Sequence, residues 1–390
     1  MTTVFHWLAL FLVAGVMAAC DTLPASGPTA SEVAAASRPT RNGETRFALV
    51  DVDPNVVARM ENWTAVSLQG TFGQQQAFST QTIGVGDSVQ VAIWEAGPGL
   101  FAAPAATADR SGSGSRAATI PEQVVGRDGA ISVPFAGRVS VVRLTPQQAE
   151  QAIVRSLDKR AADPQVLVTV TRNVANTVTV VGEVTGGARI PLTTRGDRLL
   201  DIVAQAGGTK APAYETFITL VRDGQSVRVP MQAILTNPAE NVYVRPGDVV
   251  SVAREQQSFT SAGATGQNSV VPFDALGITL DQAIARAGGL NDARADPAGV
   301  FLIRYERPVD YDQLGLRRPD PGALPQVPVI YRLNMRDPNA FFMARRFSVR
   351  NKDILYVSNA SATEVQKVIA VLLPFLGVGA TAVAVSAATR

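Results

Sequence analysis

The segment that decides the fold reads Leu199-Leu200-Asp201-Ile202-Val203-Ala204-Gln205-Ala206-Gly207-Gly208, and it returns as Leu280-Asp281-Gln282-Ala283-Ile284-Ala285-Arg286-Ala287-Gly288-Gly289. In both copies the apolar residues recur at helical spacing, so each copy is predicted to form an amphipathic helix. The two glycines that close each copy can adopt the left-handed conformation that ends a helix without strain. We therefore predict that Gly207, Gly208, Gly288 and Gly289 are structural helix stops.

Each predicted helix is followed, further along the chain, by a turn and a short apolar strand. The first turn is Arg245-Pro246-Gly247-Asp248 before Val249–Val252, and the second is Asn351-Lys352-Asp353 before Ile354–Val357. The second copy is longer because it contains a Pro-rich insertion, Pro308–Pro328. The repeat predicts two copies of a small β-grasp-like α+β unit, in which Gly247 and Asp248 are turn residues.

Another mixed module is predicted to start near Gln81, upstream of the repeat. Val85-Gly86-Asp87 indicates a turn, and Ser88–Trp94 then alternates apolar and polar side chains as a half-buried strand does. Asp128-Gly129 indicates a hairpin between the apolar stretches on either side of it. Thr145-Pro146-Gln147-Gln148 begins a helix, with threonine as N-cap and proline at the first helical position.

The composition excludes several classes of function. The 390 residues are enough for two or three domains, and the net charge of +2 gives no reason to expect a nucleic-acid partner. The only histidine is His6 and the only cysteine is Cys20, both in the N-terminal segment. Removal of that segment would exclude Ser-His-Asp and Cys-His catalysis, histidine metal sites and disulfides. We expect no cofactor and no metal.

The N-terminus is predicted to be a targeting segment. Trp7–Ala19 is apolar but too short to span a bilayer, as in a secretory signal peptide. Met17-Ala18-Ala19-Cys20 is similar to a lipobox, which predicts cleavage before Cys20 and acylation of its thiol and amine. The alternative is an ordinary signal peptide with an incidental cysteine. The following stretch, Thr22–Arg41, is rich in small and polar residues and is predicted to be a flexible tether.

The C-terminal segment is predicted to enter a membrane. Val368–Thr389 contains no charge and is long enough, as a helix, to cross ~30 Å of hydrocarbon. Pro374, Gly377 and Gly379 are tolerated in membrane helices where neighbouring helices cover the backbone. On its own this segment indicates a single-pass anchor, but a chain with a lipid at its other end would not need a second one.

Motifs along the chain resemble those of a known family. They are Ile83-Gly84-Val85-Gly86-Asp87, Ile120-Pro121-Glu122-Gln123-Val124-Val125, Pro134-Phe135-Ala136-Gly137, Val180-Val181-Gly182-Glu183-Val184, Ala206-Gly207-Gly208, Arg245-Pro246-Gly247-Asp248, Ala287-Gly288-Gly289-Leu290 and Asp353-Ile354-Leu355-Tyr356-Val357-Ser358-Asn359. In this order, with the cysteine motif and the terminal apolar segment, they resemble the Wza-like polysaccharide export lipoproteins of Gram-negative outer membranes. The resemblance is to the branch that works with capsule ABC transporters, and it runs from about Gln81 to the C-terminus.

The resemblance implies an α+β chain that exports polysaccharide and is not an enzyme. The implied parts are a signal peptide (1–19), a lipidated, flexible periplasmic lead-in (20–77), a polysaccharide export domain (78–173), two β-grasp-like soluble-ligand-binding (SLBB) domains (174–254 and 255–360) and a membrane-spanning helix (361–390). A homo-oligomeric ring is also implied, with eight subunits in the best-known relatives and a barrel of terminal helices through the outer membrane. The implied partners are capsular polysaccharide and an inner-membrane polysaccharide co-polymerase/ABC transporter complex.

Two other functions remain open. The first is an inner-membrane or periplasmic assembly factor that tethers a polysaccharide transporter without forming a pore; Asp21 and the very apolar terminal segment favour it. The second is a carbohydrate-active enzyme that uses two carboxylates. The sequence contains no acidic pair flanked by aromatic residues, as sugar-binding platforms usually would, and this argues against the enzyme.

Overall fold

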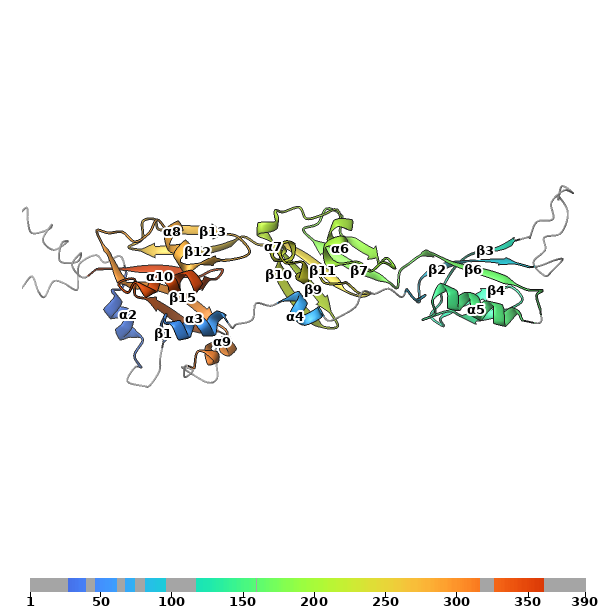
Figure 1. The fold of residues 1–390 in the computed structure, drawn as a ribbon, viewed down its shortest axis with the longest axis horizontal. Coiled ribbons are helices and arrows are strands. Elements are labelled where there is room, and N and C mark those ends of the chain that lie inside the picture. The colour runs from blue at the N-terminus through green and yellow to red at the C-terminus, as the bar shows by residue number, and fades with distance from the viewer. Residues whose placement is uncertain are drawn as a thin grey trace, which may run out of the picture. The chain divides into compact units, whose positions relative to one another are not determined.

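The computed structural model of the protein describes residues 27–39, 46–61, 67–73, 81–95, 117–158, 160–315 and 326–360 (Figure 1). The chain divides into two compact units, one formed by Met1–Thr64 with Gln256–Arg390 and the other by Ala65–Glu255. Helices and strands are mixed within both units, which confirms the predicted α+β fold class.

The module upstream of the repeat is built on a three-stranded antiparallel sheet of order β3-β2-β6. Its elements are β2 (Ser88–Trp94), β3 (Ala117–Val124), β4 (Ala130–Val133), β5 (Gly137–Ser140), α5 (Pro146–Leu157) and β6 (Gln165–Arg172). The inward side chains of β2 (Val89, Val91 and Ile93) pack against Ile153 and Leu157 of α5 in one buried cluster. The predicted strand and the predicted helix start are both confirmed, because Thr145 and Gln148 form a capping box before α5.

The hairpin predicted at Asp128-Gly129 is wrong. The chain does turn there, with Gly129 at a φ of +71°, but the strand that follows pairs with β5 and not with β3. The Gln123 side chain explains the difference, because its amide donates to the Ser132 carbonyl and accepts from the Ser132 N–H. The β4 edge that would have met β3 is thus held by a side chain instead of a backbone ladder.

The first repeated module has a five-stranded sheet of order β10-β9-β11-β7-β8, in which β7 and β11 are parallel. Its elements are β7 (Thr177–Gly182), β8 (Ala188–Pro191), α6 (Leu199–Gln205), the 3-10 helix η2 (Ala213–Glu215), β9 (Thr216–Arg222), β10 (Gln225–Pro230), α7 (Met231–Thr236), the 3-10 helix η3 (Pro238–Glu240) and β11 (Val249–Arg254). Leu199, Ile202 and Val203 of α6 are buried against the sheet. The sheet and this helix together form the core of the module.

The second repeated module has the same strand order with one strand added, β1-β16-β15-β18-β12-β13. Its elements are β12 (Gln257–Gly263), β13 (Ser269–Phe273), β14 (Ile278–Thr279), α8 (Leu280–Arg286), β15 (Ala295–Glu306), α9 (Pro308–Gln313), β16 (Val327–Leu333), α10 (Asn339–Arg346), β17 (Ser348–Val349) and β18 (Ile354–Asn359). Strands β12 and β18 are parallel, as β7 and β11 are in the first module. The two modules are therefore copies of one fold, as the sequence repeat predicts.

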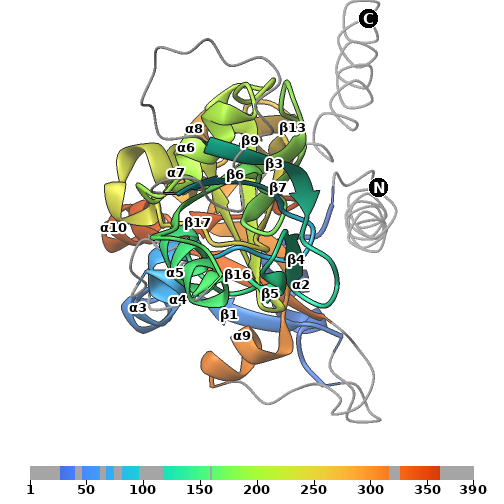
Figure 2. The same ribbon diagram turned by 90° about the vertical axis from the view of Figure 1, so that its right-hand side faces the viewer.

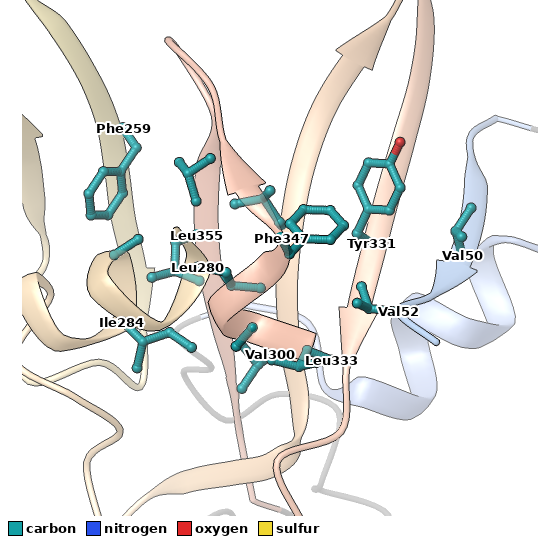
Figure 3. Close-up of a cluster of buried hydrophobic side chains, with 14 of the residues drawn as sticks. Val50, Val52, Phe259, Leu280, Ile284, Val300, Tyr331, Leu333, Phe347 and Leu355 are labelled. Atoms are coloured by element: carbon teal, nitrogen blue, oxygen red, sulfur yellow. The ribbon is translucent and has the colours of Figure 1, made fainter. Parts of the chain in front are cut away.

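The N-terminal part of the chain completes both repeated modules. Strand β1 (Ala48–Asp51) adds to the edge of the second sheet in parallel with β16 (Figure 2), and Val50 and Val52 enter the core of that module (Figure 3). Helix α3 (Pro54–Glu61) also contributes Val57 to this core. Helix α4 (Leu68–Phe72) lies on the first module, where Leu68 and Phe72 are buried.

The predicted flexible tether is wrong over Ala30–Ala36, which form helix α2. Thr29 and Glu32 form a capping box, and Val33 is buried against Phe301 and Ile330 of the second module. The Tyr356 hydroxyl also donates to the Pro28 carbonyl at 2.7 Å. The stretch is rich in alanine, a strong helix former, and the cap, the buried valine and this hydrogen bond hold it on the module.

Candidate functional site

A buried aspartate closes the turn that precedes a strand in each of the three modules. In the first motif, Asp87 accepts from the Gly84 N–H at 2.8 Å, and its other oxygen accepts from the N–H groups of Val174 and Ala175. Asp248 accepts from the Arg245 N–H in the same way, at 2.8 Å. The preceding glycines, Gly86 and Gly247, have φ values of +91° and +88°. These predicted turn residues therefore lie at the start of β2 and β11 and orient the strands.

The third turn has a different residue in the glycine position. Lys352 has a φ of +69°, and Asp353 after it accepts from the Arg350 N–H at 2.7 Å. The hydrogen bond that closes the turn is thus the same in all three modules. The turn before β18 holds its left-handed residue without a glycine, which is uncommon for a long side chain.

In both repeated modules the turn aspartate is also paired with a buried arginine, which sequence reasoning missed. Arg222 donates to both oxygens of Asp248, at 2.9 and 2.6 Å, and Arg304 donates to both oxygens of Asp353. Each guanidinium also donates to a backbone carbonyl, that of Tyr243 or that of Ser348. A signal was available, because in both copies an arginine follows an apolar strand segment at the same place in the repeat.

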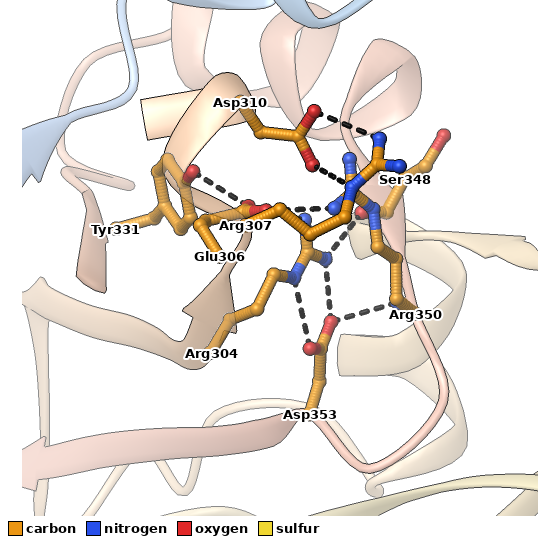
Figure 4. A network of polar contacts seen from close by, with 8 residues as sticks. All are labelled: Arg304, Glu306, Arg307, Asp310, Tyr331, Ser348, Arg350 and Asp353. Atoms are coloured by element: carbon orange, nitrogen blue, oxygen red, sulfur yellow. Dashed lines mark hydrogen bonds and ion pairs between the residues drawn. The ribbon is translucent and has the colours of Figure 1, made fainter. Parts of the chain in front are cut away.

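The second module adds further buried groups to this pair (Figure 4). Glu306 is fully buried and accepts from Arg350 at 2.8 Å, from the Tyr331 hydroxyl at 2.8 Å and from Arg304 at 3.3 Å. Burial and the neighbouring Glu306 carboxylate raise the pKa of Tyr331 far above its ordinary value, so its hydroxyl stays a neutral donor. Burial is the largest single effect on Arg304 and opposes its charge, but the hydrogen bonds and charge of Asp353 together with the charge of Glu306 outweigh it and raise the pKa of Arg304. Every charge in the cluster therefore has a partner of opposite sign.

The two Gly-Gly pairs end their helices with the same set of hydrogen bonds. The Gly208 N–H donates to the Val203 carbonyl at 3.0 Å, and the Gly289 N–H donates to the Ile284 carbonyl at 2.9 Å. All four glycines (Gly207, Gly208, Gly288 and Gly289) have φ values between +76° and +82°. This arrangement is a Schellman motif, in which the glycines satisfy the last helical carbonyls.

Valine at Gly208 or Gly289 is expected to destabilise its module by roughly 1–2 kcal/mol. A side chain would have room at both sites, since no heavy atom lies within 4 Å of an added Cβ, so the cost comes from the left-handed backbone. Gly186→Val is the matched control, because Gly186 is exposed and is not among the glycines of positive φ. Thermal unfolding of the full chain checks this; melting of both variants that matches the control would contradict the assignment.

Two groups of predicted site residues lie outside the described residues. These are the lipidation site Cys20 and the membrane-helix residues Val368, Pro374, Gly377 and Gly379. Among the helices that the structure describes, none is both long and apolar enough to cross a membrane. The same part of the chain contains no group of three or more histidine, cysteine, aspartate or glutamate side chains placed to hold a metal ion.

A cleft of 790 Å³ opens in the upstream module, between the end of β2, the end of α5 and the start of β6. It is lined by Trp94, Glu95, Val154, Arg155, Asp158, Asp163, Pro164 and Gln165. Glu95 is buried, Trp94 is half-buried, and the two aspartates are exposed. The sequence contains no acidic pair flanked by aromatic residues, because the carboxylates that line this cleft come from separate segments of the chain. Folding brings them together beside the indole.

An apolar pocket of 370 Å³ lies between α2 and the sheet of the second module. Val33, Phe301, Ile330 and Tyr356 are among its lining residues. Glu32 is the one charged residue among the described lining residues, and hydrogen bonds from the Thr29 backbone and side chain lower its pKa. The pocket exists because α2 contacts the sheet through few side chains, which leave space between the helix and the sheet.

Comparison with known proteins gives consistent matches along the chain. A family profile described as polysaccharide biosynthesis/export protein matches residues 75–171, and the SLBB domain profile matches residues 176–252 and 257–357. The capsule polysaccharide export outer membrane protein CtrA of Neisseria meningitidis serogroup A is 38% identical over 92% of this chain and 92% of its own. The capsule polysaccharide export protein BexD of Haemophilus influenzae is 33% identical over 91% and 92% of the two chains. The Vi polysaccharide export protein VexA/TviF of Salmonella typhi is 26% identical over 85% and 89%.

Proposed function

The chain belongs to the capsule polysaccharide export family of outer-membrane proteins, and we propose that it carries a capsular polysaccharide across the outer membrane. The observation that carries this proposal is the extent of the likeness, since 38% identity over 92% of both chains includes residues of all three modules. The family transports polysaccharide, and the chain is not an enzyme.

The internal chemistry of the modules supports a passive role. Asp87, Asp248 and Asp353 are committed to turn N–H groups, and the last two also bind buried arginines. Groups held in this way fix a shape and do not turn over a substrate. A transporter subunit driven from elsewhere needs such rigid modules and no catalytic group of its own.

The finer arrangement that we propose has two membrane attachments. An acylated Cys20 anchors the chain in the inner leaflet of the outer membrane, and the modules, divided as 78–173, 174–254 and 255–360, lie in the periplasm. Residues 361–390 carry the C-terminus to the cell surface, and identical copies form a ring with a helical barrel. An inner-membrane polysaccharide co-polymerase/ABC transporter complex supplies the polymer. The sequence supports this arrangement. A periplasmic tether would need only the lipid anchor, yet the chain also has the uncharged C-terminal segment Val368–Thr389.

Cys20→Ser is expected to leave the precursor unprocessed and to abolish labelling by a clickable palmitate analogue. The reason is chemical, because the thiol is the acyl acceptor and Cys20 is the only cysteine of the chain. Asp21→Ser is the matched control, since it changes the neighbouring residue and keeps the thiol. Labelling of the Cys20→Ser protein at the level of the parent would rule out the lipid anchor.

An epitope tag after Arg390 is expected to be reached by antibody on intact cells in which the tagged gene replaces the native one. A tag in the exposed turn at Asp223-Gly224 is the control and should be reached only after permeabilisation. Replacing residues 365–389 with a generic apolar membrane helix should abolish capsule export that the parent restores. A C-terminal tag that needs permeabilisation, or a swapped helix that still exports capsule, would leave the protein as a periplasmic tether.

A further inference from the structure

We propose that the cleft lined by Trp94, Glu95, Arg155, Asp158 and Asp163 binds uncharged sugar residues of the exported chain. The inference rests on the proposed function, because that function supplies a polysaccharide to the module. The cleft has the volume of a small-ligand site, 790 Å³, and lies between the end of β2, the end of α5 and the start of β6.

The lining combines the two kinds of surface that a sugar presents. A pyranose ring has apolar C–H faces and an equator of hydroxyl groups. The half-buried Trp94 offers a rigid aromatic surface for a C–H face. Around it, Glu95, Asp158 and Asp163 can accept hydroxyl protons, while Arg155 and Gln165 can donate.

The charge of the lining selects among sugars. Among the described residues that line the cleft, three are acidic and one, Arg155, is basic, which is an excess of negative charge. Glu95 is buried, with 6% of its surface exposed, and its charge is less screened by salt than that of an exposed carboxylate. An acidic sugar would be repelled, and an uncharged one would not. Binding through hydroxyl groups should also change little between low and high salt.

The backbone at the edge of the cleft supports a binding role. Asp163 has a φ of +44°, in the left-handed region that non-glycine residues seldom adopt. Such conformations are often found where a side chain must be held in a required position. Here the conformation places the Asp163 carboxylate on the cleft lining, between α5 and β6.

The test is calorimetric titration of the detergent-purified full chain with oligosaccharides cut from the capsule of the strain that supplies the gene. Trp94→Ala should weaken binding at least tenfold, whereas Trp94→Phe, which keeps an aromatic face, should stay within about threefold of the parent. Asp163→Asn should weaken binding severalfold. Its control is Asp223→Asn, another aspartate with a positive φ (+49°) that does not line the cleft, and it should have no effect.

Several outcomes would overturn the inference. One is the absence of binding to these oligosaccharides, and another is equal binding by Trp94→Ala and the parent. Binding that collapses with added salt would show that an anionic sugar is held by charge, against the proposal. Binding of an oligolysine peptide by a protein that does not bind the oligosaccharides would assign the cleft to a basic protein partner. Capsule export in complemented cells is measured separately, so export by the parent without sugar binding refutes this cleft alone.

Discussion

Arg304→Met is expected to destabilise the second repeated module by about 3–5 kcal/mol, the usual effect of removing one partner from a buried ion cluster. The Arg304, Asp353 and Glu306 side chains are 4%, 2% and 0% exposed. Without the guanidinium, two carboxylates stay in the interior: Glu306 keeps Arg350 and the neutral Tyr331 hydroxyl, and Asp353 keeps the Arg350 N–H. Methionine fills a similar space, so the cost comes from the uncompensated charge and not from a cavity.

The measurement is amide hydrogen exchange of strands β15 and β18 in the full chain, because it reports the free energy of opening of this module alone. Arg332→Met is the matched control. Arg332 also forms an ion pair, with Asp51, but the two side chains are 33% and 64% exposed, so its loss should cost under about 1 kcal/mol. Arg304→Met combined with Asp353→Asn should recover part of the lost stability, because asparagine removes one uncompensated charge and still accepts from the Arg350 N–H. Equal protection in Arg304→Met and Arg332→Met would refute the argument.

The first module should respond less to the equivalent change, Arg222→Met. That substitution leaves one buried carboxylate, Asp248, and this carboxylate keeps its hydrogen bond from the Arg245 N–H. The second module has, in addition, Glu306 and Tyr331 around the same ion pair. Two copies of one fold thus carry different numbers of buried charges.

Features that depend on a few neighbouring residues could be predicted from the sequence. The Gly-Gly stops and the capping box at Thr145 are local, because glycine and threonine act through their own backbone and the next turn. The repeat could be found because the copies share spacing as well as residue type. From these features and the order of the motifs, the family and the α+β class followed.

Features that depend on distant residues could not be predicted. The cleft joins Trp94 to Asp163 only after β2 and β6 pair, with Trp94 opposite Gln165. The hairpin at Asp128-Gly129 failed because one side chain, Gln123, replaces a ladder. The small and polar composition around Ala30–Ala36 predicts a tether, but the capping box and the burial of Val33 on the second module make it a helix.

Gly263→Ala is expected to prevent stable folding of the second module, and Gly182→Ala should do the same in the first. Both glycines end a strand, β12 or β7, that pairs in parallel with the last strand of its module. An added Cβ at Gly263 would lie 2.1 Å from the Val357 carbonyl oxygen, and one at Gly182 would lie 2.0 Å from that of Val252. Both positions also have left-handed φ values, +89° and +101°.

The clash cannot be relieved by a side-chain movement, because the obstructing atom belongs to the backbone of the adjoining strand. Val357 and Val252 accept hydrogen bonds from the N–H groups of Ala264 and Glu183, so moving either carbonyl would break the strand pairing next to the turn. We expect a loss of roughly 3 kcal/mol or more, the range of overpacking combined with backbone strain. Gly208→Ala separates the two causes: its φ is +76° but an added Cβ meets nothing within 4 Å, so it should cost only about 1 kcal/mol. Limited proteolysis of the full chain, with cleavage sites mapped by mass spectrometry, should show Gly263→Ala cut within residues 257–359 and Gly182→Ala cut within residues 177–254. Fragment patterns identical to that of Gly208→Ala would show that the strand approach is looser than the structure has it.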